Sequence, residues 1–129
     1  MLDNASLDQL AKEAVDSALA VHIALGPGLL ESTYEACLAH ELKKRRMAVA
    51  TQVGLPVIYD GQKLDIGYRI DILIAGALIL EVKAVEGIAP VHKAQLLSYL
   101  KLSGCRLGLL LNFNVARMKD GIVRMVNGF

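Results

Sequence analysis

The sequence predicts an α/β fold in which a mixed central β-sheet is flanked by helices. Apolar residues recur at helical spacing along the first third of the chain, and short runs rich in Val, Ile and Leu follow. A further helical pattern separates the middle strands from the last ones. The resulting order, α-α-β-β-β-α-β-β, suits a mixed sheet with helices packed against it.

Composition limits what the chain can be. Its 129 residues, of 13.9 kDa, make up one domain's worth of sequence, so we expect a single domain over residues 1–129. The hydrophobic content of 54% and the mean hydropathy of +0.44 are high for this size and indicate that a partner subunit covers apolar surface. The net charge of +1 counts against strong nucleic-acid binding by the chain alone. The one basic run, residues 43–46, is interpreted as a solvated helix end.

The cysteines and the N-terminus bear on the compartment. Cys37 and Cys105 lack metal-ligand spacing and lie in apolar contexts, so we expect them to be reduced packing residues. The N-terminus carries acid instead of a basic region, and no uncharged stretch reaches the roughly 18 residues that span a bilayer. These features predict a cytoplasmic protein that does not cross a membrane.

Two helices are predicted first. The helix Ser6–Leu25 has an apolar stripe, a capping box formed by Ser6 and Gln9, and a stop at Gly26-Pro27-Gly28. The second helix is predicted over Leu29–Arg46. Both helices therefore precede the sheet in the chain.

The strands follow. Val49–Asp60 is predicted as a strand that Pro56 moves to a sheet edge or a bulge, and Asp60-Gly61 marks a tight turn into a strand from about Gln62. The sequence leaves open whether the residues from 64 to 74 form one bent strand or two. The remaining predicted elements are a hairpin of Ile70–Ile74 and Ala77–Val82, each strand buried on both faces, a helix Pro90–Ser103 closed by Gly104, and strands Arg106–Phe113 and Gly121–Val126.

Polar residues interrupt the predicted hairpin. Asp71 lies in its first strand and Glu81 in its second, and a carboxylate in such an apolar run stays charged only if a cation, a metal or hydrogen-bond donors replace its water. Lys83 lies two residues after Glu81 and points to the same side of the strand. We expect the three side chains to meet at one point.

The loop of the hairpin decides whether Asp71 and Glu81 share a face. A two-residue turn, Ala75-Gly76, pairs Asp71 with Leu80, whereas a three-residue loop, 75–77, pairs it with Glu81. The second register requires a positive φ at Gly76 or a neighbour and brings the two Cβ atoms to about 4.5–5.5 Å. We predict the second register.

These residues carry a resemblance to a known superfamily. An acid on one strand followed by E-x-K on the next resembles the PD-(D/E)xK nucleases, although Ile70 stands where their signature has proline. Residues 28–34 fit G-x-x-E-x-x-Y, which names a family of small prokaryotic proteins grouped with these nucleases. Residues 95–99 fit the Q-x-x-x-Y element of one branch of the superfamily. The matches run from about residue 28 to residue 99.

The resemblance implies a restriction-endonuclease-like core and a Mg²⁺-dependent (or Mn²⁺-dependent) endonuclease or exonuclease acting on DNA or RNA. It implies that Asp71 and Glu81 are the principal metal ligands, that the Val82 carbonyl is another, and that Glu31 binds the metal directly or through water. Oxygen ligands of this kind suit either ion. By the same resemblance Lys83 orients or deprotonates the attacking water, and Gln95 and Tyr99 support the site.

Other interpretations stay open. In one alternative, an internal ion-pair network of Asp71, Glu81 and Lys83 only stabilises the sheet and binds no metal. For Glu31, the alternative is an acid that simply complements the helix dipole in the first turn of a helix. The protein is then a non-catalytic nucleic-acid-binding or regulatory subunit, or an oligomeric interaction protein. We also expect a homodimer, with the segment Gly121–Phe129 packing across a two-fold axis or else covering the monomer's own sheet.

Overall fold

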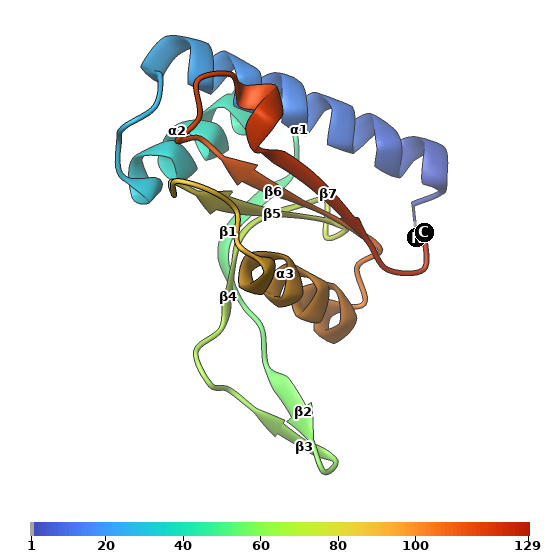
Figure 1. Ribbon diagram of the computed structural model, residues 1–129. Helices are drawn as coiled ribbons and strands as arrows, with labels where there is room; N and C mark the ends of the chain where they lie inside the picture. Colours follow the sequence, from blue (N-terminus) through green and yellow to red (C-terminus); the bar gives the residue numbers. More distant parts are fainter. Residues whose placement is uncertain (1) are drawn as a thin grey trace.

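The computed structural model describes residues 2–129 as a five-stranded sheet with helices on both faces and a projecting hairpin (Figure 1). The elements, in chain order, are α1 (Asn4–Leu25), α2 (Glu31–Lys44), β1 (Val49–Gly54), β2 (Val57–Tyr59), β3 (Gln62–Leu64), β4 (Arg69–Ile74), β5 (Leu78–Lys83), α3 (Pro90–Ser103), β6 (Leu107–Asn112), the 3-10 turn η1 (Met118–Gly121) and β7 (Ile122–Val126).

The sheet has the strand order β1-β4-β5-β6-β7. Strands β5 and β6 are parallel, joined by the crossover helix α3, and the other three pairs are antiparallel. The predicted fold class, a mixed central sheet flanked by helices, is therefore confirmed. Strand β5 is buried on both faces as predicted, but alternate residues of β4 are only half-buried.

Two apolar cores lie on opposite faces of the sheet. Side chains of α1 and α2 pack against one face, where even-numbered residues of β5 such as Leu80 point. Leu96, Tyr99 and Leu100 of α3 pack against the other face, which carries Ile79 of the same strand. Because strand residues alternate between faces, Glu81 belongs to the α3 side.

The start of α1 differs from the prediction. The helix begins at Asn4, and the Asp3 carboxylate accepts a hydrogen bond of 2.8 Å from the Ser6 backbone N–H. Asp3, and not Ser6, is thus the N-cap, and the predicted capping box with Gln9 is wrong. Within residues 2–129, no helix has both the length and the apolarity needed to cross a membrane.

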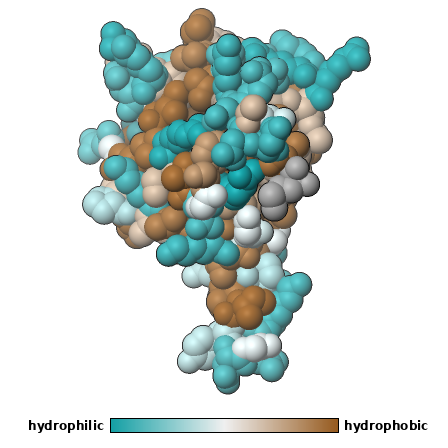
Figure 2. Space-filling model, turned by 90° about the vertical axis from the view of Figure 1, so that its right-hand side faces the viewer, coloured by the Kyte–Doolittle hydropathy of each residue, from teal (hydrophilic) through white to brown (hydrophobic). Residues whose placement is uncertain are grey.

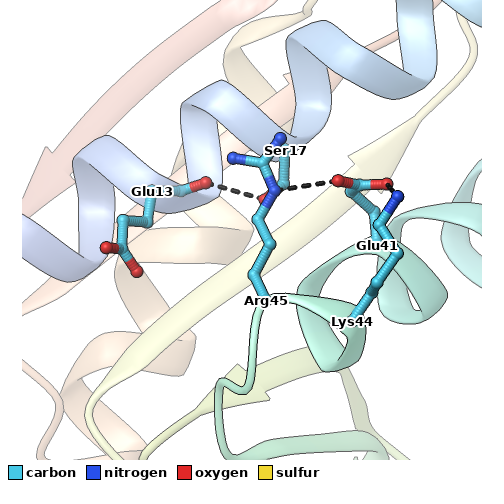
Figure 3. Close-up of polar contacts among 5 residues, drawn as sticks. All are labelled: Glu13, Ser17, Glu41, Lys44 and Arg45. Carbon is cyan, nitrogen blue, oxygen red and sulfur yellow. Dashed lines mark hydrogen bonds and ion pairs between the residues drawn. The ribbon is translucent and has the colours of Figure 1, made fainter.

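The basic run ends α2, which is shorter than predicted at both ends. Glu41 forms ion pairs with Lys44 (3.1 Å) and Arg45 (2.8 Å), and the Ser17 hydroxyl of α1 donates to the Glu13 carbonyl nearby (Figure 3). Two of the four basic residues are therefore engaged with the helix's own acid, as expected for a solvated helix end.

Residues 55–68 form a projecting segment, here called the arm. Its strands β2 and β3 pair only with each other, and the Leu55 N–H donates to the Tyr68 carbonyl at its base (Figure 1). The predicted single strand 49–60 is wrong, because β1 ends at Gly54 and Pro56, which lacks an N–H, separates it from β2. The open question about residues 64–74 is also settled, since β3 and β4 are separate strands.

Gly121 lies where the chain turns into β7. A Cβ atom there would overlap the backbone carbonyl of Asn112. Gly121→Ala is therefore expected to lower the free energy of unfolding by about 3 kcal/mol, and the melting temperature by roughly 10 °C, because backbone must move. Thermal unfolding followed by circular dichroism measures this, with Gly87→Ala as control, since a Cβ at Gly87 meets no atom within 4 Å. Equal melting temperatures for the two variants would contradict the expectation.

Candidate functional site

The β4–β5 hairpin brings the two predicted acids together. Its register pairs Ile72 with Leu80 and Ile74 with Leu78, so Asp71 lies opposite Glu81 just beyond the last paired residues. The loop has three residues, and both Ala75 (φ 54°) and Gly76 (φ 62°) adopt positive φ. The predicted register is confirmed, and the strands separate at the acids.

Backbone amides hold both carboxylates where the strands separate. The Val82 N–H donates to Asp71 Oδ2 at 2.8 Å, and the Asp71 N–H donates more weakly to Glu81 Oε1 at 3.4 Å. Successive residues of β5 direct their backbone groups alternately to β4 and β6, and the Lys83 carbonyl accepts from Phe113 on the β6 side. The Val82 carbonyl, like its N–H, therefore lies on the β4 side of the strand, and its role as a ligand stays a prediction.

Burial disfavours the charged form of the Glu81 carboxyl when no metal ion is bound. The side chain is only 4% exposed, and burial, followed by the charge of Asp71, raises the pKa of its carboxyl to about 9, which Lys83 offsets only slightly. Glu81 consequently carries a proton at neutral pH unless a cation binds beside it. A divalent ion with oxygen ligands would supply that charge.

Lys83 lies at the end of β5, half-buried and on the same side of the strand as Glu81. Asn112 fixes the loop that follows it: its side-chain oxygen accepts from the Val85 N–H (3.1 Å) and its amide donates to the Val85 carbonyl (2.9 Å). Asn112 is fully buried and its side chain is satisfied by these bonds. This residue was not predicted, because a single Asn after an apolar strand carries no distinctive pattern.

A third acid, Glu35 on α2, also reaches the site, although the sequence pointed to Glu31. Gln52 of β1 donates to both Glu35 carboxylate oxygens at 3.0 Å and, at 3.5 Å, to Asp71 Oδ1. Burial, and then the charges of Asp71 and Glu31, raise the pKa of Glu35. One feature of the sequence could have pointed to Glu35: it lies four residues after Glu31, so both acids lie on the same face of the helix.

Gln52 reaches both acids from an unusual backbone conformation. Its φ is 51°, and the β1–β4 register passes from Thr51–Ile72 to Val53–Ile70 without pairing it. Positive φ is costly for a non-glycine residue and is often found where a side chain must be aimed at a functional site. The backbone of β1 thus turns the Gln52 amide toward the acids.

Glu31 lies in the first turn of α2 and is exposed. Its charge is felt by Glu35, but in the described residues 2–129 it has no hydrogen bond or ion pair with Asp71 or Glu81. Its role as a ligand stays a prediction. The neighbouring Tyr34 has a structural role: its hydroxyl donates to the Gly26 carbonyl and accepts from the Leu29 N–H, and its ring stacks on Phe113 at 4.7 Å.

Gln95 and Tyr99 face the acids from α3. The Gln95 side-chain amide donates to the Tyr99 hydroxyl at 3.1 Å. Burial, followed by the charge of Glu81, raises the pKa of the Tyr99 hydroxyl, so this group lies close enough to feel that carboxylate. The structure therefore brings both predicted residues to the same side of the sheet as Glu81.

The oxygen atoms at the site suit a single divalent ion, although, in the part of the chain that the structure describes, they do not form a closely packed group of three acidic side chains. In residues 2–129, no three His, Cys, Asp or Glu side chains are grouped closely enough to hold a metal. Asp71 and Glu81 nevertheless lie opposite each other where β4 and β5 separate, with the Val82 backbone beside Asp71, and carboxylate and carbonyl oxygens are the ligands that Mg²⁺ and Mn²⁺ prefer. Water would complete the remaining coordination positions.

Comparison with known proteins agrees with this geometry. The family model of the PD-(D/E)XK nuclease superfamily matches residues 8–125, and the mixed five-stranded sheet flanked by helices is consistent with its restriction-endonuclease-like core. No curated protein and no solved structure matches the chain significantly. The smaller family named by G-x-x-E-x-x-Y stays a prediction. Since the match covers nearly the whole chain, the protein belongs to the PD-(D/E)XK nuclease superfamily.

Proposed function

We propose that the protein hydrolyses phosphodiester bonds of DNA or RNA with the help of Mg²⁺ or Mn²⁺. The observation that carries the proposal is the position of Asp71 opposite Glu81 where their strands separate. Membership of a nuclease superfamily, whose members generally use divalent metals, supports it.

Each residue has a role in this proposal. Asp71, Glu81 and the Val82 carbonyl hold the ion, and Glu31 contributes directly or through water. A bound divalent ion neutralises the phosphate and activates water. Lys83 orients the attacking water, or takes its proton, and stabilises negative charge on the phosphate. Gln95 and Tyr99 support Glu81 from α3.

The test is cleavage by the purified wild-type protein. Single- and double-stranded DNA and RNA are incubated with Mg²⁺, with Mn²⁺ and with EDTA, and products are separated on denaturing gels. We expect cleavage with the metals and none with EDTA. If no substrate is cut with either ion, a non-catalytic function replaces this proposal.

Glu35 and Glu31 can be ranked by mutation. We expect Glu35→Gln to weaken metal-dependent cleavage by about 10- to 100-fold, because Glu35 is linked through Gln52 to Asp71. Glu31→Gln, a matched change one helical turn away, is expected to have the smaller effect, since Glu31 is exposed. Initial rates over a range of Mn²⁺ concentrations separate metal affinity from turnover. A larger loss in Glu31→Gln would make Glu31 the more important acid of α2.

A non-catalytic nucleic-acid-binding or regulatory subunit is the second candidate. The lack of a three-acid cluster in residues 2–129 favours it, as does the engagement of Asp71 Oδ2 by the Val82 N–H. In that case the acids fasten the open end of the hairpin. Nucleic-acid binding without cleavage, unchanged by Asp71→Asn, would support this candidate.

We further propose a homodimer, in keeping with the high mean hydropathy. In the segment Gly121–Phe129, Val123 and Met125 pack on the α3 core and Ile122 packs on the opposite core, whereas Val126 and Phe129 are exposed. The exposed part and the open edge of β7 are the candidate contact. Light scattering at micromolar concentration is expected to give twice 13.9 kDa, and a mass of one chain would exclude the dimer.

We also place the protein in the cytoplasm. Cys37 and Cys105 are both free, and Cys105 is buried, with its thiol close to the Gly76 carbonyl (3.7 Å). Unpaired cysteines suit a reducing compartment. Fluorescence microscopy of a tagged protein in its native cell checks the location.

A further inference from the structure

A groove runs between α3 and the base of the arm, next to the carboxylates. Its lining includes Val57 and Tyr68 of the arm and Val91, Gln95, Ser98 and Tyr99 of α3. The nuclease chemistry proposed above uses only Gln95 and Tyr99 of this set. That chemistry gives no role to the remaining lining residues.

Two tyrosine rings, those of Tyr68 and Tyr99, line the groove. The Tyr68 ring lies 5.9 Å from the Tyr99 ring at an angle of 59°, so Tyr99 supports one part of it. Tyr99 is buried, but Tyr68 is 42% exposed. A partly open tyrosine ring, held in place by a buried one, is a platform on which a flat aromatic group can stack.

Polar groups line the same groove. His92 Nδ1 accepts from the Ala89 N–H at 2.9 Å, which leaves the opposite ring nitrogen, Nε2, as a donor. The Gln95 amide donates to Tyr99, which leaves its carbonyl oxygen as an acceptor, and Ser98 adds a hydroxyl. Donors and an acceptor beside a stacking surface match the edge of a nucleobase.

The groove lies on the same side of the sheet as Glu81. Tyr68 precedes Asp71 by three residues, and Tyr99 packs on the α3 side of the sheet, the face to which Glu81 belongs. Arg69, which follows Tyr68, lines a second depression together with Lys63 and Gln52. Gln52 also donates a hydrogen bond to Asp71. A strand whose base lies in the groove can therefore reach the acids with its backbone.

We propose that this groove holds an unpaired nucleobase of single-stranded DNA or RNA, stacked on Tyr68, while the adjoining phosphate lies toward Asp71 and Glu81. The inference rests on the proposed function and adds to it the kind of strand that the site takes. A base within a duplex is stacked on both faces and cannot enter the groove without being flipped out.

Charge and surface chemistry favour a single strand over a duplex. Duplex binding without base contacts depends on neutralised phosphates, but the chain has a net charge of only +1. On the arm and at its base, Asp60 and Asp65 offset Lys63 and Arg69. The arm instead shows hydrophobic surface, gathered on the part that projects from the body (Figure 2). Among the exposed side chains of the arm, Tyr68 is the one that can stack on a base in the groove.

The experiment measures binding apart from cleavage. Fluorescence anisotropy in EDTA compares three labelled probes: oligothymidylate of about twelve nucleotides, an abasic strand of the same length and phosphate number, and a duplex of that length. Wild-type protein is expected to bind oligothymidylate about tenfold more tightly than the abasic strand, equivalent to about 1.4 kcal/mol. Tyr68→Ala is expected to remove this preference, and Tyr68→Phe to keep it.

Two further variants test whether a loss of binding comes from misfolding. Tyr59→Ala changes a tyrosine that is 72% exposed on β2, outside the groove lining, and should bind like wild type. Tyr68→Leu keeps apolar bulk beside Tyr99 without an aromatic face and should lose the preference while unfolding near the wild-type temperature.

Several results would overturn the inference. One is equal binding of oligothymidylate and the abasic strand by wild type, and another is an undiminished preference in Tyr68→Leu. A third is that Tyr68→Leu splits a wild-type dimer in light scattering without altering base-dependent binding, because a second copy of the chain then covers this surface. Base-dependent binding without any cleavage would refute the proposed nuclease activity and leave the groove assignment standing.

Discussion

Asp71→Asn is expected to abolish metal-dependent cleavage of nucleic acid, a loss of roughly a thousandfold or more. The amide loses the charge that binds a cation but keeps an oxygen that can accept from the Val82 N–H. Glu81→Gln and Lys83→Ala should each abolish cleavage as well. Initial rates with Mg²⁺ and Mn²⁺ measure the loss.

Stability separates a catalytic from a structural role for Asp71. Asp71→Asn should leave the melting temperature unchanged or raise it, because the charge of Asp71 contributes to the raised pKa of Glu81 and so to the cost of keeping Glu81 protonated in the folded state. Asp120→Asn, a change in an exposed acid paired with Arg117 on η1, serves as the control and should cleave at the wild-type rate. A large fall in the melting temperature of Asp71→Asn would show that the carboxylate is needed for folding.

Glu81→Gln is expected to stabilise the metal-free protein at pH 8 by a few kcal/mol. The pKa of Glu81 is about 9 in the folded protein, against 4.5 for an unperturbed carboxyl, so between these values the folded state binds more protons than the unfolded state. Wild-type stability in EDTA should therefore fall as pH rises through this window. Gln does not titrate, so the variant should lack this part of the pH dependence.

Urea unfolding in EDTA at intervals from pH 5 to about pH 9 measures this difference. Mg²⁺ or Mn²⁺ added at pH 8 should stabilise wild type, since the ion favours the charged carboxylate, and should have little effect on Glu81→Gln. Parallel pH profiles for the two proteins would mean that Glu81 ionises as easily in the folded state as in the unfolded one.

The residues that sequence reasoning placed correctly are those whose neighbours are fixed by local rules. Asp71 and Glu81 are joined by a loop of three residues, and strand alternation then determines which residues face each other. Helix α3 begins at Pro90 and is closed by Gly104, whose φ of 77° suits glycine, so both ends carry local signals.

Long-range geometry explains what sequence reasoning missed. Glu35 joins the site only because α2 packs beside β1 and Gln52 adopts a positive φ, and neither feature has a local pattern. The turn at Asp60-Gly61 into a strand from Gln62 was predicted correctly, but not that this hairpin leaves the main sheet, because β2 and β3 have only three residues each, too few for alternation to show it. Ser6 was predicted as the N-cap in place of Asp3 because Asp and Ser both favour that position.

The arm gives this fold a place to vary. Its strands contribute no hydrogen bond to the five-stranded sheet, and its tip, Asp60-Gly61, is exposed. Extra residues at that tip would lengthen the projection without shifting the β4–β5 register on which the acids depend. Changes in one surface turn can therefore alter the length and surface of the arm near the carboxylates, while the pairing of Ile72 with Leu80 stays as it is.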